Sequence, residues 1–243
     1  MEADRTAIIT GAGKRVGEAI ARALLAEGWS VIAHVHHGED EVPEGATKVV
    51  ADLAQTDCAE RIFDAGNGMP PVRLLVNNAA RFAHDGFGAF NADELDAHMA
   101  VNVRAPALLI EALAARHPGG DALVLNLLDS KLAAPNADYL SYTLSKYALA
   151  GLTELAARAL APLSIRVNGI SPALMLRSSG QSEKNFEVMH ANNPLRRGVE
   201  PEDVVRALRY LIGATAVTGQ VITIDAGQRF YGLGRDVQFL GAE

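Results

Sequence analysis

The chain has 243 residues, of which 49% are apolar and 21% charged, with a net charge of −7, a pI near 5.5 and a mean hydropathy of +0.09. These values predict one α/β domain over residues 1–243 with a single large core, and they argue against nucleic acids and anionic membranes as partners. Cys58 is the only cysteine, and no secretory signal or twenty-residue apolar span is visible, so a soluble, cytoplasmic protein without disulfides is expected.

Short β-branched runs alternate with helical patterns along the chain. Strands are predicted at residues 6–10, 31–36, 48–51, 74–77, 122–127, 165–170 and 221–224, and helices at 13–26, 93–115, 139–161 and 201–212. Such alternation predicts a Rossmann-type α/β fold, a doubly wound parallel sheet with helices on both faces.

The first motif is a glycine turn, residues 10–17 with the sequence TGAGKRVG, between the first strand and the first helix. Bare backbone lets a phosphate approach, and the helix N-terminus adds N–H donors and a positive dipole end. The segment therefore predicts a phosphate cradle for a dinucleotide, although Val16 stands where the strict fingerprint has its third glycine. A tight strand-to-helix turn without a ligand is the alternative.

Histidines cluster at the end of the second strand, at positions 34, 36 and 37. Strand alternation places His34 and His36 on the same face, so metal binding is one interpretation. No carboxylate or cysteine partner accompanies them, and no metal site is expected.

Tyr142 and Lys146 lie four residues apart in the predicted helix 139–161, and Asp129 precedes the tyrosine by thirteen residues. This spacing puts the phenol and the ammonium on one helix face. A neighbouring positive charge favours ionisation of a phenol, whose ordinary pKa is about 10. A tyrosine tuned in this way can transfer a proton near neutral pH, although a solvated helix face is the alternative for the pair alone.

Two segments towards the C-terminus lie outside the predicted strands and helices, and the first of them shows no clear periodicity. Residues 174–197 are expected to form a flexible substrate lid, and residues 228–243 a tail packed on a neighbouring subunit or on the active site. Small residues in the 139–161 helix, including Gly151, permit close helix–helix contact in a symmetric oligomer or inside a monomer.

Taken together, these motifs resemble the short-chain dehydrogenase/reductase family over residues 5–229. That family pairs a Thr-Gly-x-x-x-Gly-x-Gly turn with a downstream Tyr-x-x-x-Lys at the distance seen here. Asn77-Asn78-Ala79, Asn102 and Ser171-Pro172-Ala173 match further elements of it.

Two departures from the family pattern point to one branch. Arg15 replaces the second glycine of the turn, and Asp129 replaces the usual catalytic serine. Both replacements are typical of pteridine reductases and dihydromonapterin reductases. Phe82 falls where that branch places an aromatic ring over the pterin.

The resemblance implies an NADPH-dependent reductase that transfers a hydride to a pteridine ring, either a dihydropterin or folate, commonly as a homotetramer. NADPH is favoured over NADH because Val35 stands where NAD-preferring members carry an acid, and because Lys14 and Arg15 lie nearby. Pteridine reductases usually have an arginine at the position of His37, so the preference should be moderate.

Residue roles follow from the same resemblance. Lys146 would bind the nicotinamide ribose and lower the pKa of Tyr142, Asp129 would orient the substrate or relay a proton, and Asn102 would connect to Lys146 through water. Cofactor binding is expected at Gly11, Lys14, Arg15, Val16, Gly17, His36, His37, Asp52, Leu53, Asn78, Ala79, Lys146 and Pro172. Substrate contacts are expected at Arg15, Phe82, Asp129, Tyr142 and Leu176.

Two other functions remain compatible with the sequence. One is a carbonyl reductase of the same family that acts on a keto substrate such as a 3-oxoacyl thioester. The other is a catalytically idle, cofactor-binding interaction protein.

Overall fold

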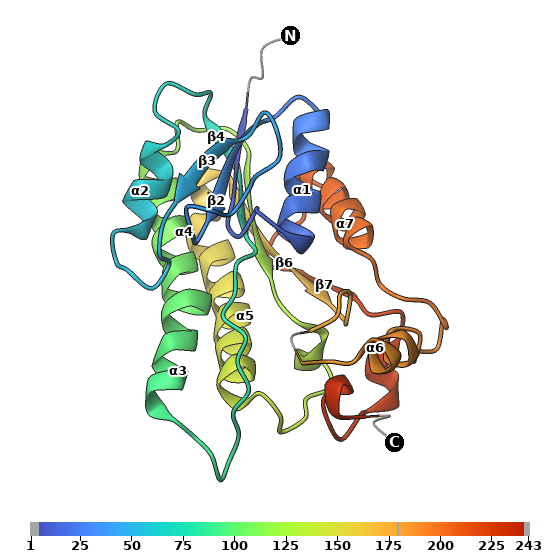
Figure 1. Ribbon diagram of the computed structural model, residues 1–243. Helices are drawn as coiled ribbons and strands as arrows, with labels where there is room; N and C mark the ends of the chain where they lie inside the picture. The colour runs from blue at the N-terminus through green and yellow to red at the C-terminus, as the bar shows by residue number, and fades with distance from the viewer. Residues whose placement is uncertain (1–4, 179, 241–243) are drawn as a thin grey trace.

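The computed structural model describes residues 5–178 and 180–240, which are arranged around a seven-stranded, all-parallel sheet (Figure 1). The order across the sheet is β3-β2-β1-β4-β5-β6-β7. The strands are β1 (Thr6–Ile9), β2 (Ser30–Val35), β3 (Thr47–Val50), β4 (Val72–Asn77), β5 (Ala122–Leu127), β6 (Ile165–Pro172) and β7 (Val221–Ile224). Residues 1–4 and 241–243 of the predicted domain, and residue 179 of the predicted lid, lie outside the described residues.

Helices cover both faces of the sheet (Figure 1). On one face lie α1 (Arg15–Ala26) and α7 (Pro201–Gly213), and on the other α2 (Cys58–Asp64), α4 (Ala105–Arg116) and α5 (Leu140–Leu160). The remaining helices are α3 (Ala92–Met99) and α6 (Glu183–His190), with short turns η1 (Ala100–Arg104), η2 (Ser130–Leu132), η3 (Ala161–Leu163), η4 (Gln228–Tyr231) and η5 (Val237–Phe239). The predicted doubly wound α/β fold is confirmed. None of the described helices is both long and apolar enough to cross a membrane.

Two features of the helices differ from the sequence-based expectation. The predicted helix 93–115 contains a π-helical turn, η1, which separates α3 from α4. The structure also contains α2 and α6, which were not predicted, because seven and eight residues show too few repeats of a helical period. The predicted lid, residues 174–197, therefore includes one regular helix.

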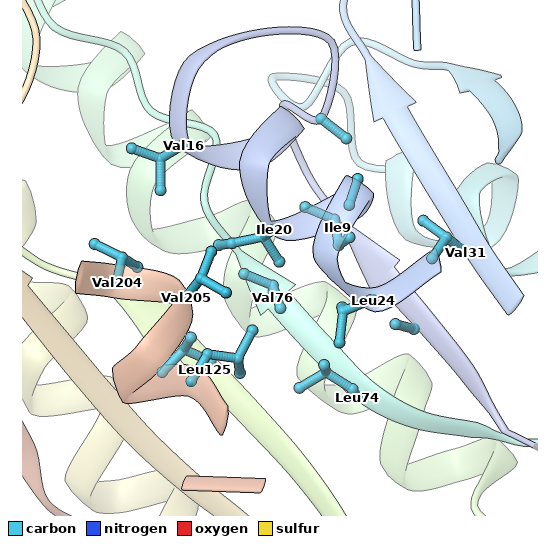
Figure 2. Packing of buried hydrophobic residues seen from close by; sticks show 14 of the residues in the cluster. Ile9, Val16, Ile20, Leu24, Val31, Leu74, Val76, Leu125, Val204 and Val205 are labelled. Atoms are coloured by element: carbon cyan, nitrogen blue, oxygen red, sulfur yellow. The ribbon is translucent and has the colours of Figure 1, made fainter. Parts of the chain in front are cut away.

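The core is divided by the sheet into two apolar layers. Ile8 and Ile9 are adjacent in β1, fully buried, and belong to opposite layers, as strand alternation requires. Ile9 belongs to the layer that also holds Ile20 of α1 and Val205 of α7 (Figure 2), and Ile8 to the layer that holds Leu109 of α4. Each such side chain contributes about 1.5–3 kcal/mol by leaving water. Strands buried on both faces explain the near-continuous apolar runs in the sequence.

The strand order reverses between β1 and β4. In open α/β sheets this is the place where ligands bind, at the carboxyl ends of the strands. The glycine turn follows β1 and Asn78 follows β4, so the fold brings two of the predicted motifs to this point.

Candidate active site

The glycine turn owes its shape to backbone geometry. Gly11 has a φ of +66° and Arg15 a φ of +57°, both in the left-handed region that favours glycine. A Cβ at Gly17 would lie 2.1 Å from the carbonyl oxygen of Gly11, so glycine is required there. Helix α1 starts at Arg15 without a side-chain cap, which leaves its first N–H groups for a ligand.

Asn78 and Thr10 fix the turn against the end of β4. The side-chain amide of Asn78 donates to the carbonyl oxygens of Thr10 at 2.8 Å and Gly11 at 3.1 Å. The Thr10 hydroxyl accepts from the backbone N–H groups of Asn78 and Ala79, each at 3.0 Å. These bonds hold the loop after β1 and the loop after β4, which meet where the strand order reverses, in one rigid arrangement.

Two cavities adjoin along this edge of the sheet. The first, of about 460 Å³, is lined by Gly11, His36, His37, Asp52 and Leu53 among others, and is called the adenine lobe below. The second, of about 570 Å³, holds Asp129, Tyr142 and Lys146 and is called the catalytic lobe. Both lobes share the lining residues Lys14, Arg15, Val16, Asn78 and Ala80. The result is an elongated, two-lobed cleft whose waist is the glycine turn, a shape that fits a dinucleotide.

The adenine lobe holds most of the residues expected to bind the adenosine end of a cofactor. His36 is largely exposed and lies 3.9 Å from Asp52. The Asp52 carboxylate accepts from the N–H of Ala54 at 2.8 Å, so it also caps its own loop. Val35, which stands where NAD-preferring members carry an acid, is buried at the end of β2 and lines this lobe. Asp40, which sequence reasoning missed, brings a carboxylate into this lobe and accepts from the N–H of His37 at 3.1 Å.

His34 has a structural role. Its Nδ1 accepts from the N–H of Gly11 at 3.2 Å, and its Nε2 lies 2.9 Å from the carbonyl of Ala51. Burial lowers the pKa of this imidazole and favours the neutral form that can accept from Gly11. The side chain thus ties the ends of β1, β2 and β3 together. Within residues 5–178 and 180–240, no three His, Cys, Asp or Glu side chains are grouped so as to hold a metal ion.

The catalytic lobe brings together the two motifs separated in the sequence. The hydroxyl of Tyr142, in the first turn of α5, donates to Oδ2 of Asp129 at 2.8 Å. Asp129 stands two residues after the end of β5 and accepts from the N–H of Lys131 at 2.9 Å. The ammonium of Lys146 donates to the carbonyl of Leu127 at 2.6 Å and lies 5.6 Å from the centre of the Tyr142 ring.

The electrostatics of this lobe contradict one expectation. Burial, together with the neighbouring charge of Asp129, raises the pKa of Tyr142 well above its ordinary value. Lys146 does not lower it, because the ammonium is directed to the Leu127 carbonyl and the group bonded to the phenol is Asp129. Burial also raises the pKa of Asp129 and lowers that of Lys146 to about 8. The Tyr142–Asp129 pair therefore retains protons and is suited to donate one.

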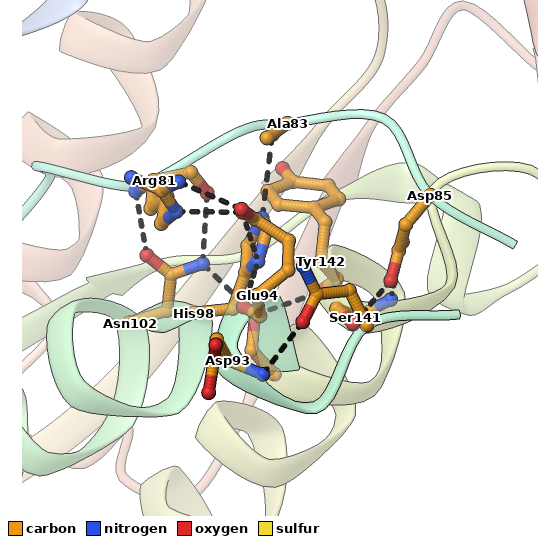
Figure 3. Close-up of polar contacts among 11 residues, drawn as sticks. Arg81, Ala83, Asp85, Asp93, Glu94, His98, Asn102, Ser141 and Tyr142 are labelled. Carbon is orange, nitrogen blue, oxygen red and sulfur yellow. Dashed lines mark hydrogen bonds and ion pairs between the residues drawn. The ribbon is translucent and has the colours of Figure 1, made fainter. Parts of the chain in front are cut away.

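Asn102 lies in the π-helical turn η1 and bridges the loop after β4 to α5 (Figure 3). Its side-chain oxygen accepts from the N–H of Arg81 at 2.8 Å, and its amide donates to the carbonyl of Arg81 at 3.0 Å and to the Ser145 hydroxyl at 2.9 Å. Asn102 and Gly17 are the two predicted site residues that line neither lobe.

The loop that carries Phe82 is anchored by polar contacts that no sequence motif reveals (Figure 3). Arg81 forms an ion pair with Glu94 at 2.7 Å, and the N–H of Ala83 donates to the fully buried His98 at 3.3 Å. Asp85, which is 5% exposed, accepts from the N–H of Ser141 at the start of α5. These contacts could be found only from the three-dimensional structure, because the partners in each come from different elements.

Phe82 lines the catalytic lobe with 45% of its surface exposed. Its ring stacks on Tyr139 with 4.3 Å between centres and meets the edge of Tyr142 at 4.7 Å. Pro172 and Leu176 also line this lobe. Arg15 donates to the carbonyls of Leu176 at 3.3 Å and Arg177 at 3.0 Å, which connects the glycine turn to the start of the predicted lid.

The chain is similar to known reductases over most of its length. A family model described as enoyl-(acyl carrier protein) reductase matches residues 11–229. The chain is 31% identical to pteridine reductase 1 of Leishmania tarentolae, over 91% of this chain and 95% of that protein. It is 32% identical to the L-xylulose reductase of Bos taurus, over 93% of this chain and 96% of that protein.

Two solved structures are similar over nearly the whole length. One is FolM alternative dihydrofolate reductase 1 from Brucella suis in complex with NADP, with a TM-score of 0.87, 35% identity and coverage of 95% of this chain and 97% of that chain. The other is the protein of the same name from Brucella canis complexed with NADP, with a TM-score of 0.89, 36% identity and coverage of 95% and 96%.

Proposed function

The chain belongs to the short-chain dehydrogenase/reductase family, in its pteridine reductase-like branch, and from this premise we propose that it is an NADPH-dependent reductase of a pteridine ring, either a dihydropterin or folate. The observation that carries the proposal is the hydrogen bond between Tyr142 and Asp129 in the catalytic lobe. A carboxyl group there suits the ring nitrogens and amino group of a pterin better than it suits a ketone.

The two-lobed cleft supports NADPH as the cofactor. The adenine lobe, with His36, His37, Asp52 and Leu53, would hold the adenosine end, and the glycine turn and the α1 N-terminus the phosphates. Lys146, Asn78, Ala79 and Pro172 would hold the nicotinamide ribose and ring. When bound, NADPH supplies the hydride.

The protein's own residues supply the proton and the orientation of the substrate. Asp129 donates a proton to the ring nitrogen beside the reduced carbon, and the Tyr142 hydroxyl holds the carboxyl group in place through its hydrogen bond. The raised pKa of Asp129 supports this role, because burial favours the protonated acid. Phe82 offers a ring face to a flat heterocycle, and Arg15 offers a planar donor that remains charged. Residues 174–197 act as the lid over this lobe, with Leu176 in contact with the substrate.

The assembly we propose is a cytoplasmic homotetramer. Leu144, Tyr147 and Leu155 of α5 expose between 44% and 67% of their surface, more apolar area than a solvated helix face needs. Light scattering of the purified protein tests the stoichiometry.

A carbonyl reductase is the second candidate, and the similarity to L-xylulose reductase at 32% identity favours it. The decisive experiment measures NADPH consumption with dihydropterins beside a panel of ketones. Turnover of a dihydropterin well above that of every ketone is expected. Clean turnover of ketones but not of dihydropterins selects the second candidate, and absence of turnover across the whole panel indicates a cofactor-binding interaction protein.

A further inference from the structure

The described C-terminal segment, residues 228–240, forms part of the wall of the catalytic lobe. It contributes Gln228, Arg229, Leu233, Arg235, Asp236 and Val237 to the lining of the cavity that holds Asp129 and Tyr142. Within this segment, η5 lies beside α6 (Figure 1), and Arg235 contacts Asp138 just before the start of the catalytic helix α5. The cavity is therefore bounded by residues about a hundred positions apart in the sequence.

Asp138, two residues before α5, holds this segment in place. Its carboxylate accepts from Nε of Arg235 at 2.9 Å and from the N–H of Asp236 at 2.7 Å. Lys131 adds a second link, since its ammonium donates to the Asp138 carbonyl and lies 3.5 Å from the Asp236 carboxylate. The side chains of Asp138 and Lys131 are only 11% and 8% exposed, whereas that of Arg235 is 58% exposed. The contacts of Asp138 with the N–H of Asp236 and of Lys131 with Asp236 should therefore hold the segment more firmly than the Arg235 ion pair does.

An aromatic stack connects the segment to the pocket wall. Tyr139 has a φ of +56°, a strained value for a residue that is not glycine. Its ring is nearly parallel to two others, that of Phe82, at 4.3 Å between centres, and that of Phe239 of the C-terminal segment, at 6.0 Å. Its hydroxyl also donates to the side-chain oxygen of Gln238. The position of the segment thus bears on the orientation of Phe82.

The lid helix provides a second anchor. Asn185 of α6 is 5% exposed, and its side-chain amide donates to the carbonyls of Val237, at 3.4 Å, and Leu240. The oxygen of the same side chain accepts from Gln181 at 2.7 Å. The C-terminal segment is consequently fixed between the lid helix and the start of α5.

We propose that this C-terminal segment is a specificity-determining wall of the substrate cavity, and that Asp138 is the positioning residue that holds it there. The inference rests on the proposed function only in taking a flat bicyclic ring as the substrate. Binding of a wide ring depends on contacts with both Phe82 and the wall, whereas binding of a small ketone depends on neither. Release of the segment should therefore weaken binding of wide substrates while the chemical groups stay in place.

The test compares Asp138→Ala with Asp203→Ala. Asp203 is a matched control, because its side chain is 16% exposed and accepts from two arginines, Arg197 and Arg206, and from the N–H of Glu200, at the start of α7 on another part of the molecule. Each variant is assayed for kcat and KM with a dihydropterin, a bicyclic ketone and a small aliphatic ketone. NADPH affinity, thermal stability and hydrogen exchange at residues 236–240 are measured on the same preparations.

For Asp138→Ala we expect the KM for the wide substrates to rise about tenfold, with kcat, NADPH affinity and the KM for the small ketone changed by less than about twofold. Exchange at residues 236–240 should accelerate in that variant alone. Arg235→Ala should change the same quantities in the same direction but less, since its side chain is 58% exposed.

The proposal is overturned if Asp138→Ala and Asp203→Ala leave the ratio of wide to small substrate turnover equally unchanged. Failure of the wild-type enzyme to reduce dihydropterins, with the bicyclic ketone still reduced, contradicts the proposed function instead. The ratio of bicyclic to small ketone then still decides whether the segment sets specificity.

Discussion

The Tyr142 hydroxyl and the Asp129 carboxylate form a 2.8 Å hydrogen bond that joins the start of α5 to the loop after β5. Both groups have raised pKa values, chiefly because the protein buries them. An acid pair of this kind holds its proton at pH values where free carboxylates have lost theirs. This property separates the site from one built on a serine.

The cofactor preference depends on charge in the adenine lobe. NADPH should be used in preference to NADH by a moderate factor, because Val35 replaces the usual acid while Asp40 adds a carboxylate nearby. Asp40→Asn keeps an oxygen for the His37 N–H but removes the negative charge. It should improve kcat/KM for NADPH about threefold and leave NADH unchanged. Equal gains for both cofactors would show that Asp40 does not lie near the 2′-phosphate that distinguishes NADPH from NADH. Better use of NADH than of NADPH by the wild type would contradict the predicted preference itself.

Phe82 should bind the substrate ring. Phe82→Ala should raise the KM for a dihydropterin about three- to tenfold, the equivalent of an offset ring contact, and raise the KM for a small ketone less. Phe87→Ala is the matched control, because Phe87 lies in the same loop, is 87% exposed and does not line the cavity. Steady-state kinetics with both substrates provide the test. Parallel changes in the two KM values would identify Phe82 as packing for Tyr139.

Cofactor affinity should depend on the protonation of Lys146. Burial lowers the pKa of this ammonium to about 8, so its charge is present below that pH and is lost as the pH rises through it. The affinity of the cofactor-free protein for NADPH, measured by fluorescence titration, should therefore fall between about pH 7 and pH 9. Lys146→Arg should keep the affinity constant across this range, since guanidinium remains charged. A fall that persists in Lys146→Arg would assign the titration to another group.

The sequence predicted the sheet, because its strands are apolar runs of β-branched residues, and it predicted Tyr142, Lys146 and Asp129 together, because their spacing is a family motif. Contacts between elements that are far apart in the sequence correspond to no recognisable sequence pattern. Asp85 with Ser141, and Asp138 with Arg235, are ordinary charged or polar residues until the fold places them side by side.

Two individual residues show the limits of pattern reasoning more sharply. His34 shared a strand face with His36 in the sequence, yet its imidazole is a buried structural link, because depth in the sheet cannot be read from alternation. Lys146 was correctly placed on the face of Tyr142, but the direction of its ammonium depends on the Leu127 carbonyl, a backbone group that no residue pattern encodes.

The role of Asp129 can be isolated by three substitutions. Asp129→Ala should leave NADPH affinity nearly unchanged while dihydropterin turnover falls by about 10²-fold or more, the usual effect of losing one acid–base group. Asp129→Asn retains the shape and an acceptor for the Tyr142 hydroxyl but has no acidic proton, so it should be as slow as the alanine variant. Asp129→Ser should recover little pterin turnover. It should improve reduction of simple ketones at pH values where Asp129 has lost its proton, because a carboxylate repels the developing negative oxygen and a serine hydroxyl donates to it.

The pH dependence of turnover gives an independent reading of the same residue. Because burial raises the pKa of Asp129, the protonated acid is present below that raised value, and dihydropterin turnover should decline as the pH rises through it. Asp129→Asn should abolish this decline in whatever activity remains, since the amide does not titrate. Wild-type rates of dihydropterin turnover in Asp129→Ala would remove the main support for a pteridine reductase, and the carbonyl reductase would then be the better account of this site.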